Sequence, residues 1–247
     1  MKTRAELIHT NIKNLKSLWE TAGAAFDSYH KTPVFEYCEI HASEWPNRLW
    51  LHQPINQETV DLIKQKIGET ATPITLPVWD IYDDNQSAVL ENNDFVFIFE
   101  QVGMSLKPSH FFDIQGDVNI ERVTDSTEAK LWSVLFQKSF GYEISLETVS
   151  KTLSEIEYYI AYSDGLAVGT AILHQTNSVM GIHAIGIPPE MRRRGYADQI
   201  MRLLINKIIK NGFEYITLQA SNMGLNLYLK LGFKEQFLIK NYRLAQR

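Results

Sequence analysis

The chain has 247 residues, of which 45% are hydrophobic and 11% aromatic, and its net charge is −5. This is enough apolar material for the core of one large domain or two modest ones. The acidic balance argues against a nucleic-acid surface, and no apolar run approaches the ~20 residues that span a bilayer.

The single cysteine, Cys38, excludes an internal disulfide. It lies in the apolar segment VFEYCEI, which favours a buried, inert thiol over a nucleophile. The N-terminal segment lacks the apolar region and cleavage site of a signal peptide, and no metal-ligand spacing occurs. We therefore expect a soluble, cytoplasmic protein without a metal and without a membrane or nucleic-acid partner.

Hydrophobic periodicity predicts alternating helices and strands in the first half of the chain. A helix is expected over residues 4–26, where apolar residues recur at helical spacing. The later elements are strands at 34–40 and 48–52, a helix at 57–67, a strand at 75–81, a short helix at 86–91 and a strand at 95–106. Residues 107–118 contain Pro, Gly and Asp without a clean period and predict a linker. The expected domains are therefore 1–112 and 113–247.

The second half predicts the order β-α-α-β-β-β-α-β-α-β. Strands are expected at 119–124, 157–162, 166–174, 179–187, 215–220 and 233–244, and helices at 126–140, 146–153, 195–211 and 224–231. The expected fold class is α/β, a mixed sheet with helices on both faces. From Val34, the first half reads β-β-α-β-α-β, and the second half reads the same from Leu166. Duplication and chance similarity of two α/β halves both remain open.

The segment GIHAIGIPPEMRRRGYADQIM, residues 181–201, predicts a phosphate-binding turn. A strand ends at a double proline, and a turn rich in arginine and glycine then opens a helix. The first N–H groups of a helix have no partner inside it and carry the positive end of its dipole. Gly195 lets the backbone approach a ligand closely. Such a turn is suited to a diphosphate.

Two motifs here resemble those of the GNAT superfamily of acyl-CoA-dependent N-acyltransferases. The first is Arg192-Arg193-Arg194-Gly195-Tyr196-Ala197 after the strand that ends at Ile187-Pro188-Pro189. The second is LQASNMGLNLYLKLGF at 218–233. The resemblance spans about Asn119 to Arg247, with all elements in family order. It implies a GNAT-like fold in the C-terminal half.

The resemblance also implies roles for particular residues. The backbone of Ile185 and Ile187 would pair with the pantetheine arm as an added strand. Tyr228 falls on the family's general acid for the departing thiolate. The residues that would hold the pyrophosphate are Arg192, Arg193, Arg194, Gly195, Tyr196 and Ala197. Ser221 stands where the family has Asn, and Gly224 where it has Ala, which puts the side-chain contact near the pantetheine in doubt.

The general base is less defined. Attack needs a neutral amine, so a base or a water chain must take a proton. His183, two residues before Ile185, titrates in a useful range, although a hydrogen-bonded core histidine fits its position equally well. His174 and Glu157 are further candidates.

We therefore expect an N-acetyltransferase that moves an acetyl group from acetyl-CoA, its co-substrate, to a primary amine in a ternary complex. No cysteine lies near the motifs, which argues against an acyl-enzyme. A CoA-binding regulatory module without turnover, and a transferase of a longer acyl group, are the alternatives. The acceptor is a small-molecule or peptide amine, and its identity and the oligomeric state stay open.

The N-terminal half is expected to be a smaller α/β domain, GNAT-like but degenerate, without its own CoA site. Its strand-to-helix junction, residues 49–64, has no glycine or arginine, and Glu58 and Asp61 would repel a diphosphate. An unrelated accessory domain is the alternative. Trp45, Trp50 and Trp79 are candidates to wall the substrate pocket.

Overall fold

A computed structural model describes residues 2–81 and 86–245. In this part of the chain, short strands form a three-stranded sheet, and the others form an eight-stranded mixed sheet. The small sheet contains β1 (Tyr29–Lys31), β2 (Phe35–Cys38) and β3 (Arg48–Leu51). The large sheet contains β4 (Leu76–Trp79), β5 (Phe95–Leu106), β6 (Asn119–Arg122), β7 (Glu157–Ser163), β8 (Leu166–Thr176), β9 (Val179–Gly186), β10 (Tyr215–Ala220) and β11 (Lys234–Leu244).

The helices follow the predicted positions closely. They are α1 (Arg4–Ala24), α2 (Gln57–Gly68), α3 (Gln86–Glu91), α4 (Ser126–Phe140), α5 (Leu146–Thr152), α6 (Tyr196–Lys210) and α7 (Leu225–Lys230), with a 3₁₀ turn at Pro189–Met191. The α/β class and the mixed sheet are confirmed. The prediction missed β1, because three polar and aromatic residues carry no usable period. Cys38 is buried and its Sγ donates to the Trp19 carbonyl, as a packed thiol would.

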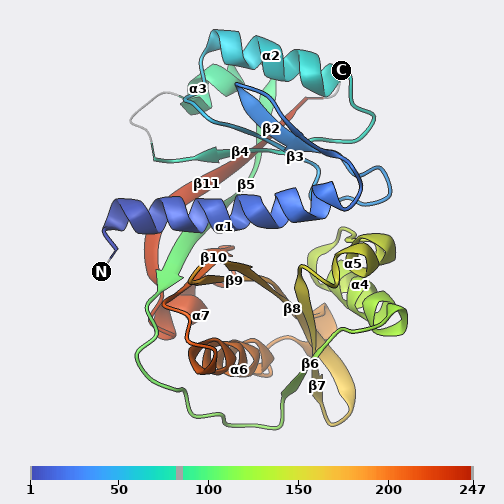
Figure 1. The fold of residues 1–247 in the computed structure, drawn as a ribbon, viewed down its shortest axis with the longest axis vertical. Coiled ribbons are helices and arrows are strands. Elements are labelled where there is room, and N and C mark those ends of the chain that lie inside the picture. Colours follow the sequence, from blue (N-terminus) through green and yellow to red (C-terminus); the bar gives the residue numbers. More distant parts are fainter. Residues whose placement is uncertain (1, 82–85, 246–247) are drawn as a thin grey trace.

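Helices cover both faces of the large sheet (Figure 1). On one face α1, α4 and α5 bury an apolar core against β7 and β8, with Trp132 and Tyr158 at its centre. On the other face α6 packs the apolar side of its amphipathic surface, including Met201 and Leu204, against the same strands. A third core lies between α2, α3 and the strands of the N-terminal half.

The two halves of the chain exchange their last strands. The order of the large sheet is β4-β11-β5-β10-β9-β8-β7-β6, so β11 separates β4 from β5, and β5 separates β10 from β11. A bridge between Arg48 and Thr75 joins β3 to β4 in parallel, just as β10 pairs with β9 in parallel. The N-terminal half therefore has the order β2-β3-β4-β11-β5, and the C-terminal half has the order β8-β9-β10-β5-β11. In each half an antiparallel pair is followed by a parallel strand, then by the last strand of the other half, and then by its own last strand. This matching order is what duplication predicts.

The exchange makes one continuous structure of the two halves. Figure 1 shows β5 and β11 running side by side from the upper part of the molecule past α1 toward α7. Their pairing extends from the Phe95–Leu244 pair to the Ser105–Lys234 pair. The segment 107–118 has no helix or strand, and it is held on α6 by two hydrogen bonds between Asn206 and the Phe112 backbone. Residues 107–118, the expected linker, are therefore a connection packed on α6. The large sheet contains strands from both sides of this segment.

Candidate active site

Strands β9 and β10 separate along their length and open the sheet. Their parallel pairing runs from Val179–Tyr215 to Gly181–Thr217 and goes no further, although β10 continues to pair with β5 as far as Ala220. Ala184 has a φ of 53° at a bulge opposite β8. A bulge redirects the backbone that follows it. The polar groups of β9 beyond Gly181, where Ile185 lies, are therefore turned away from β10 and available to a ligand.

A chain of hydrogen bonds crosses this opening. Nδ1 of His183 on β9 lies 3.0 Å from Oε1 of Gln219 on β10, and Nε2 lies 3.0 Å from Oδ1 of Asn14 on α1. Gln219 Nε2 donates to Asn11 Oδ1 over 2.7 Å. A Cβ on Gly181 would fall 1.9 Å from Asn14 Oδ1, so only glycine leaves room for this contact.

The burial of these groups controls the charge of His183. Burial lowers its pKa to about 3, and nearby His174 lowers it further, while the Gln219 contact acts in the opposite direction. The ring is therefore neutral near pH 7. Both ring nitrogens already face amide oxygens, so neither has a lone pair directed freely into the opening. This geometry is unfavourable for direct proton removal from an amine, and the base assignment stays a prediction.

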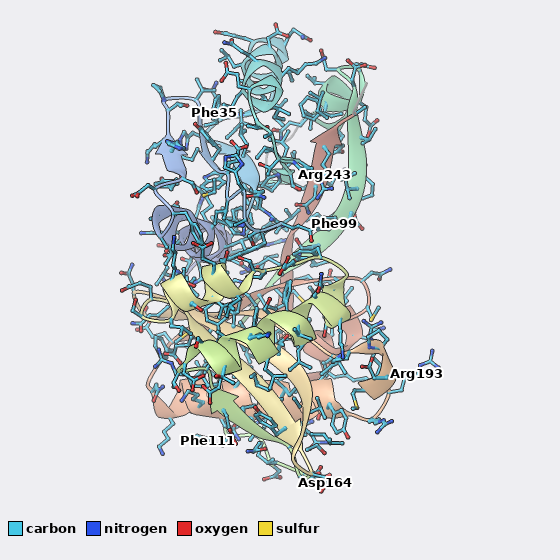
Figure 2. The ribbon with its side chains drawn as sticks, turned by 90° about the vertical axis from the view of Figure 1, so that its right-hand side faces the viewer. Phe35, Phe99, Phe111, Asp164, Arg193 and Arg243 are labelled. Atoms are coloured by element: carbon cyan, nitrogen blue, oxygen red, sulfur yellow. The ribbon has the colours of Figure 1, made fainter. Side chains whose placement is uncertain are left out.

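The predicted phosphate turn lies at the end of β9. Gly195, with a φ of 81°, forms the N-cap of α6 and supplies no side-chain cap, so the first N–H groups of the helix are left for a ligand. A Cβ at Gly195 would meet nothing within 4 Å, which shows open space before the turn. Arg193 projects from the body of the protein (Figure 2). The turn therefore fits a diphosphate by space and by polarity.

The arginines of the turn have different roles. Arg192 donates from Nε to the Ile187 carbonyl at 3.0 Å and from Nη2 to the Ser139 carbonyl at 2.9 Å, which ties the end of β9 to α4. Arg194 donates to the Glu190 carbonyl. Arg193 and Arg194 are exposed, as a pair of cations beside a diphosphate would need to be. Arg192 thus stabilises the position of the turn through hydrogen bonds to two backbone carbonyls.

Tyr228 on α7 reaches the opening from the β10 side. Its ring covers Gly224, where a Cβ would lie 2.9 Å from the ring, and it stands edge-on to Phe233. Burial raises its pKa to about 12, so the hydroxyl keeps its proton near pH 7. Ser221, which precedes α7, is exposed at the same opening, and its backbone carbonyl accepts from Gly224 and Leu225.

A cavity of about 150 Å³ lies at this opening. Four predicted site residues line it: His183, Ile185, Ser221 and Tyr228. Its far wall is aromatic and comes from α1, the β2–β3 connection and the region of α4: Trp19, Trp45, Phe136, Phe140 and Tyr142. Of the three tryptophans proposed as walls, Trp45 lines the cavity, while Trp50 and Trp79 pack behind it against Trp19.

The other candidate bases lie outside the cavity lining. His174 is buried on β8, where Nε2 contacts Ser17 Oγ and burial lowers the pKa to about 4. Glu157 on β7 accepts a short hydrogen bond from the Tyr159 hydroxyl. In the part of the chain that the structure describes, no group of three or more acidic, cysteine or histidine residues could hold a metal ion, and no helix is long and apolar enough to cross a membrane.

Sequence reasoning missed the contributions of α1 to the site. Asn11 and Asn14 are fully buried there, and Ser17 follows three residues later. Their spacing puts them in one row beside the apolar stripe of α1. A row of short polar residues along a buried helix face was the available signal.

The splayed strands β9 and β10, the glycine turn without a side-chain cap and Tyr228 lie at one opening of the sheet, as the two sequence motifs predict. Residues 127–233 match the model of the acetyltransferase (GNAT) family. The match includes the turn, His183 and Tyr228. No curated protein matches the sequence significantly.

Solved structures extend the similarity to the whole chain. A GCN5-related N-acetyltransferase from Kribbella flavida is 12% identical with a TM-score of 0.71, covering 95% of this chain and 96% of that one. One from Sphaerobacter thermophilus is 14% identical with a TM-score of 0.62, covering 85% and 76%. A GCN5-related N-acetyltransferase-like protein from Streptococcus suis is 16% identical with a TM-score of 0.58, covering 98% and 100%. The N-terminal half thus belongs to a fold these proteins share.

Proposed function

We propose that the protein transfers an acetyl group from acetyl-CoA to a primary amine by direct attack within a ternary complex. The observation that carries this proposal is the combination of three features: the Gly195 turn without a side-chain cap, the part of β9 that does not pair with β10, and the cavity lined by Ile185 and Tyr228. A diphosphate at the turn and a thioester at the cavity would use all three.

Each part of the site would bind a different part of acetyl-CoA. The amides after Arg193, together with the α6 dipole, would hold the diphosphate. The backbone near Ile185 would bind the pantetheine arm and direct an N–H at the thioester oxygen as negative charge develops there. The amine forms the new C–N bond as the C–S bond breaks. Tyr228 then gives its proton to the departing sulfur, and water takes the proton that the amine loses.

The size of the cavity supports a small acyl group. A volume of about 150 Å³ must hold both the acyl group and the reacting end of the acceptor, whereas pockets for drug-sized ligands run to roughly 300–1,000 Å³. Acetyl fits this limit better than a long acyl chain.

A CoA-binding module without turnover is the second candidate. It is favoured by one observation, that both nitrogens of His183 are engaged by protein amides and leave no evident base. Measurement of free CoA released from acetyl-CoA across a panel of primary amines separates the two. Amine-dependent release supports the transferase. Tight acetyl-CoA binding without release under any amine supports the module.

A further inference from the structure

Arg48, at the start of β3 in the N-terminal half, is one of the residues that line the cavity. Its guanidinium lies over the Trp19 ring, 5.1 Å from the centroid, and Nη1 donates to the Pro46 carbonyl at 3.0 Å. These two contacts fix the plane and rotation of the group. They use one face and one nitrogen of its five-donor fork.

The other edge of the guanidinium has no protein partner among the described residues. Nε is buried without a hydrogen bond, and no interaction is seen for Nη2. Nε–H and the neighbouring Nη2–H point the same way and form the side-on pair that binds a carboxylate with two parallel hydrogen bonds. The buried Nε–H costs stability unless a ligand supplies its acceptor.

The charge of Arg48 is also unbalanced. No carboxylate within 4.0 Å pairs with it in the described part of the chain, and no acidic residue is among the described residues that line the cavity. Burial lowers its pKa, nearby Tyr142 acts in the opposite direction, and the positive charge of Arg243 lowers it further. The cavity thus has one cation beside its apolar aromatic walls. It is a poor site for a second ammonium and a good one for an anion.

We propose that the acceptor is an amine that carries a carboxylate on an apolar frame, such as an apolar amino acid, with the carboxylate bound by Arg48. This rests on the proposed function only in treating the cavity as the acceptor site. With the carboxylate held by Arg48, the amine would lie toward His183 and Tyr228, which line the same cavity. Arg48 is then a specificity residue, and the N-terminal half supplies it.

The test measures binding without turnover. Leucine, methionine and phenylalanine, each beside its methyl ester, are titrated by calorimetry into the full-length protein saturated with CoA. We expect at least one free acid to bind, its ester to bind roughly 10- to 100-fold more weakly, and Arg48→Met to remove that difference. Equal binding of acid and ester, undiminished acid binding by Arg48→Met, or no acid binding at all would overturn the proposal.

Two further measurements keep the result interpretable. Arg48→Met removes a buried charge without an ion-pair partner and should retain the thermal stability of the wild type. If it does not fold, Arg48→Lys serves, since a point charge cannot form the two parallel bonds and should weaken acid binding more than ester binding. Turnover is read separately. Acid binding that depends on Arg48 but brings no CoA release would refute the transferase and support the carboxylate ligand. CoA release only with amines that lack a carboxylate would support the transferase and refute the carboxylate ligand.

Discussion

His183 and Gln219 face each other across the opening of the sheet, with Nδ1 of the imidazole 3.0 Å from Oε1 of the amide. The orientation of this contact is set from a distance. Asn11 donates to the Met104 carbonyl and Asn14 to the His174 carbonyl, so backbone acceptors end the chain on both sides. The amides must then present their oxygens to His183. A neutral imidazole donates from only one nitrogen, whereas the two amide oxygens would both accept from a protonated ring. Burial therefore favours the neutral form of His183, and the hydrogen-bond partners favour the charged form.

This opposition predicts a pH-dependent stability. The pKa is lowered to about 4 for His174 and about 3 for His183, against 6.5 for an ordinary histidine. As the pH falls from about 6.5 to 4, the unfolded chain gains these protons before the folded one. The free energy of unfolding should therefore fall, by up to about 1.4 kcal/mol per pH unit for each histidine.

Urea unfolding at pH 7 and pH 5 measures this slope. His174→Gln removes one of the two titrations, and its free energy of unfolding should depend less steeply on pH than that of the wild type. An unchanged slope would mean that His174 titrates normally in the folded protein.

Gly195→Asp should weaken acetyl-CoA binding at least about 100-fold, because a carboxylate meets the diphosphate and like charges in contact cost several kcal/mol. The added Cβ meets nothing within 4 Å, so the effect on folding should be limited to the backbone strain of a non-glycine residue at a φ of 81°. Gly212→Asp is the matched control. Gly212 follows the other end of α6 at a φ of 77°, also with open space. Calorimetry that finds equal losses in both variants would contradict the turn assignment.

Tyr228→Phe should lower kcat by roughly 10²-fold or more, with little change in acetyl-CoA affinity, because the hydroxyl acts only when the thiolate leaves. The raised pKa, about 12, predicts that the wild-type rate shows no loss from Tyr228 ionisation below about pH 10. Tyr162→Phe on β7, outside the cavity, should retain full activity. An unchanged kcat in Tyr228→Phe would transfer the proton-donor role to water.

The strand exchange predicts that the halves depend on each other. In isolation, residues 113–247 would lose β4 and β5, leaving both edges of β11 and one edge of β10 unpaired. This fragment should fail to bind CoA alone and regain binding when co-expressed with residues 1–112. A stable, CoA-binding fragment 113–247 would show that the halves are independent.

The sequence predicted the residues of the expected CoA site more fully than the residues that line the cavity. The Gly195 turn and Tyr228 were accessible because their roles depend on local chain conformation and short spacing. Asn14, Gln219 and Arg48 were not, because they reach the cavity from distant segments through packing that no local pattern encodes. The exchange of β5 and β11 was missed for the same reason, since strand neighbours are set by long-range contacts.

The N-terminal half shows why the matching turn predicts no second CoA site. Asn56 caps α2, and its side chain accepts from the Thr59 N–H while Thr59 bonds back to the Asn56 backbone. At the start of α6 the first N–H groups have no side-chain cap, whereas the corresponding groups of α2 are partly bonded by its own cap. Whether the halves share an origin stays a prediction that superposing residues 34–106 on 166–245 would test.

The most direct test of the central claim is a crystal structure with acetyl-CoA bound. We predict the diphosphate on the amides at Gly195, the pantetheine arm along β9 at Ile185, and the thioester sulfur within hydrogen-bond reach of the Tyr228 hydroxyl. A thioester outside the opening between β9 and β10, or CoA bound at the Asn56 cap of α2, would contradict it.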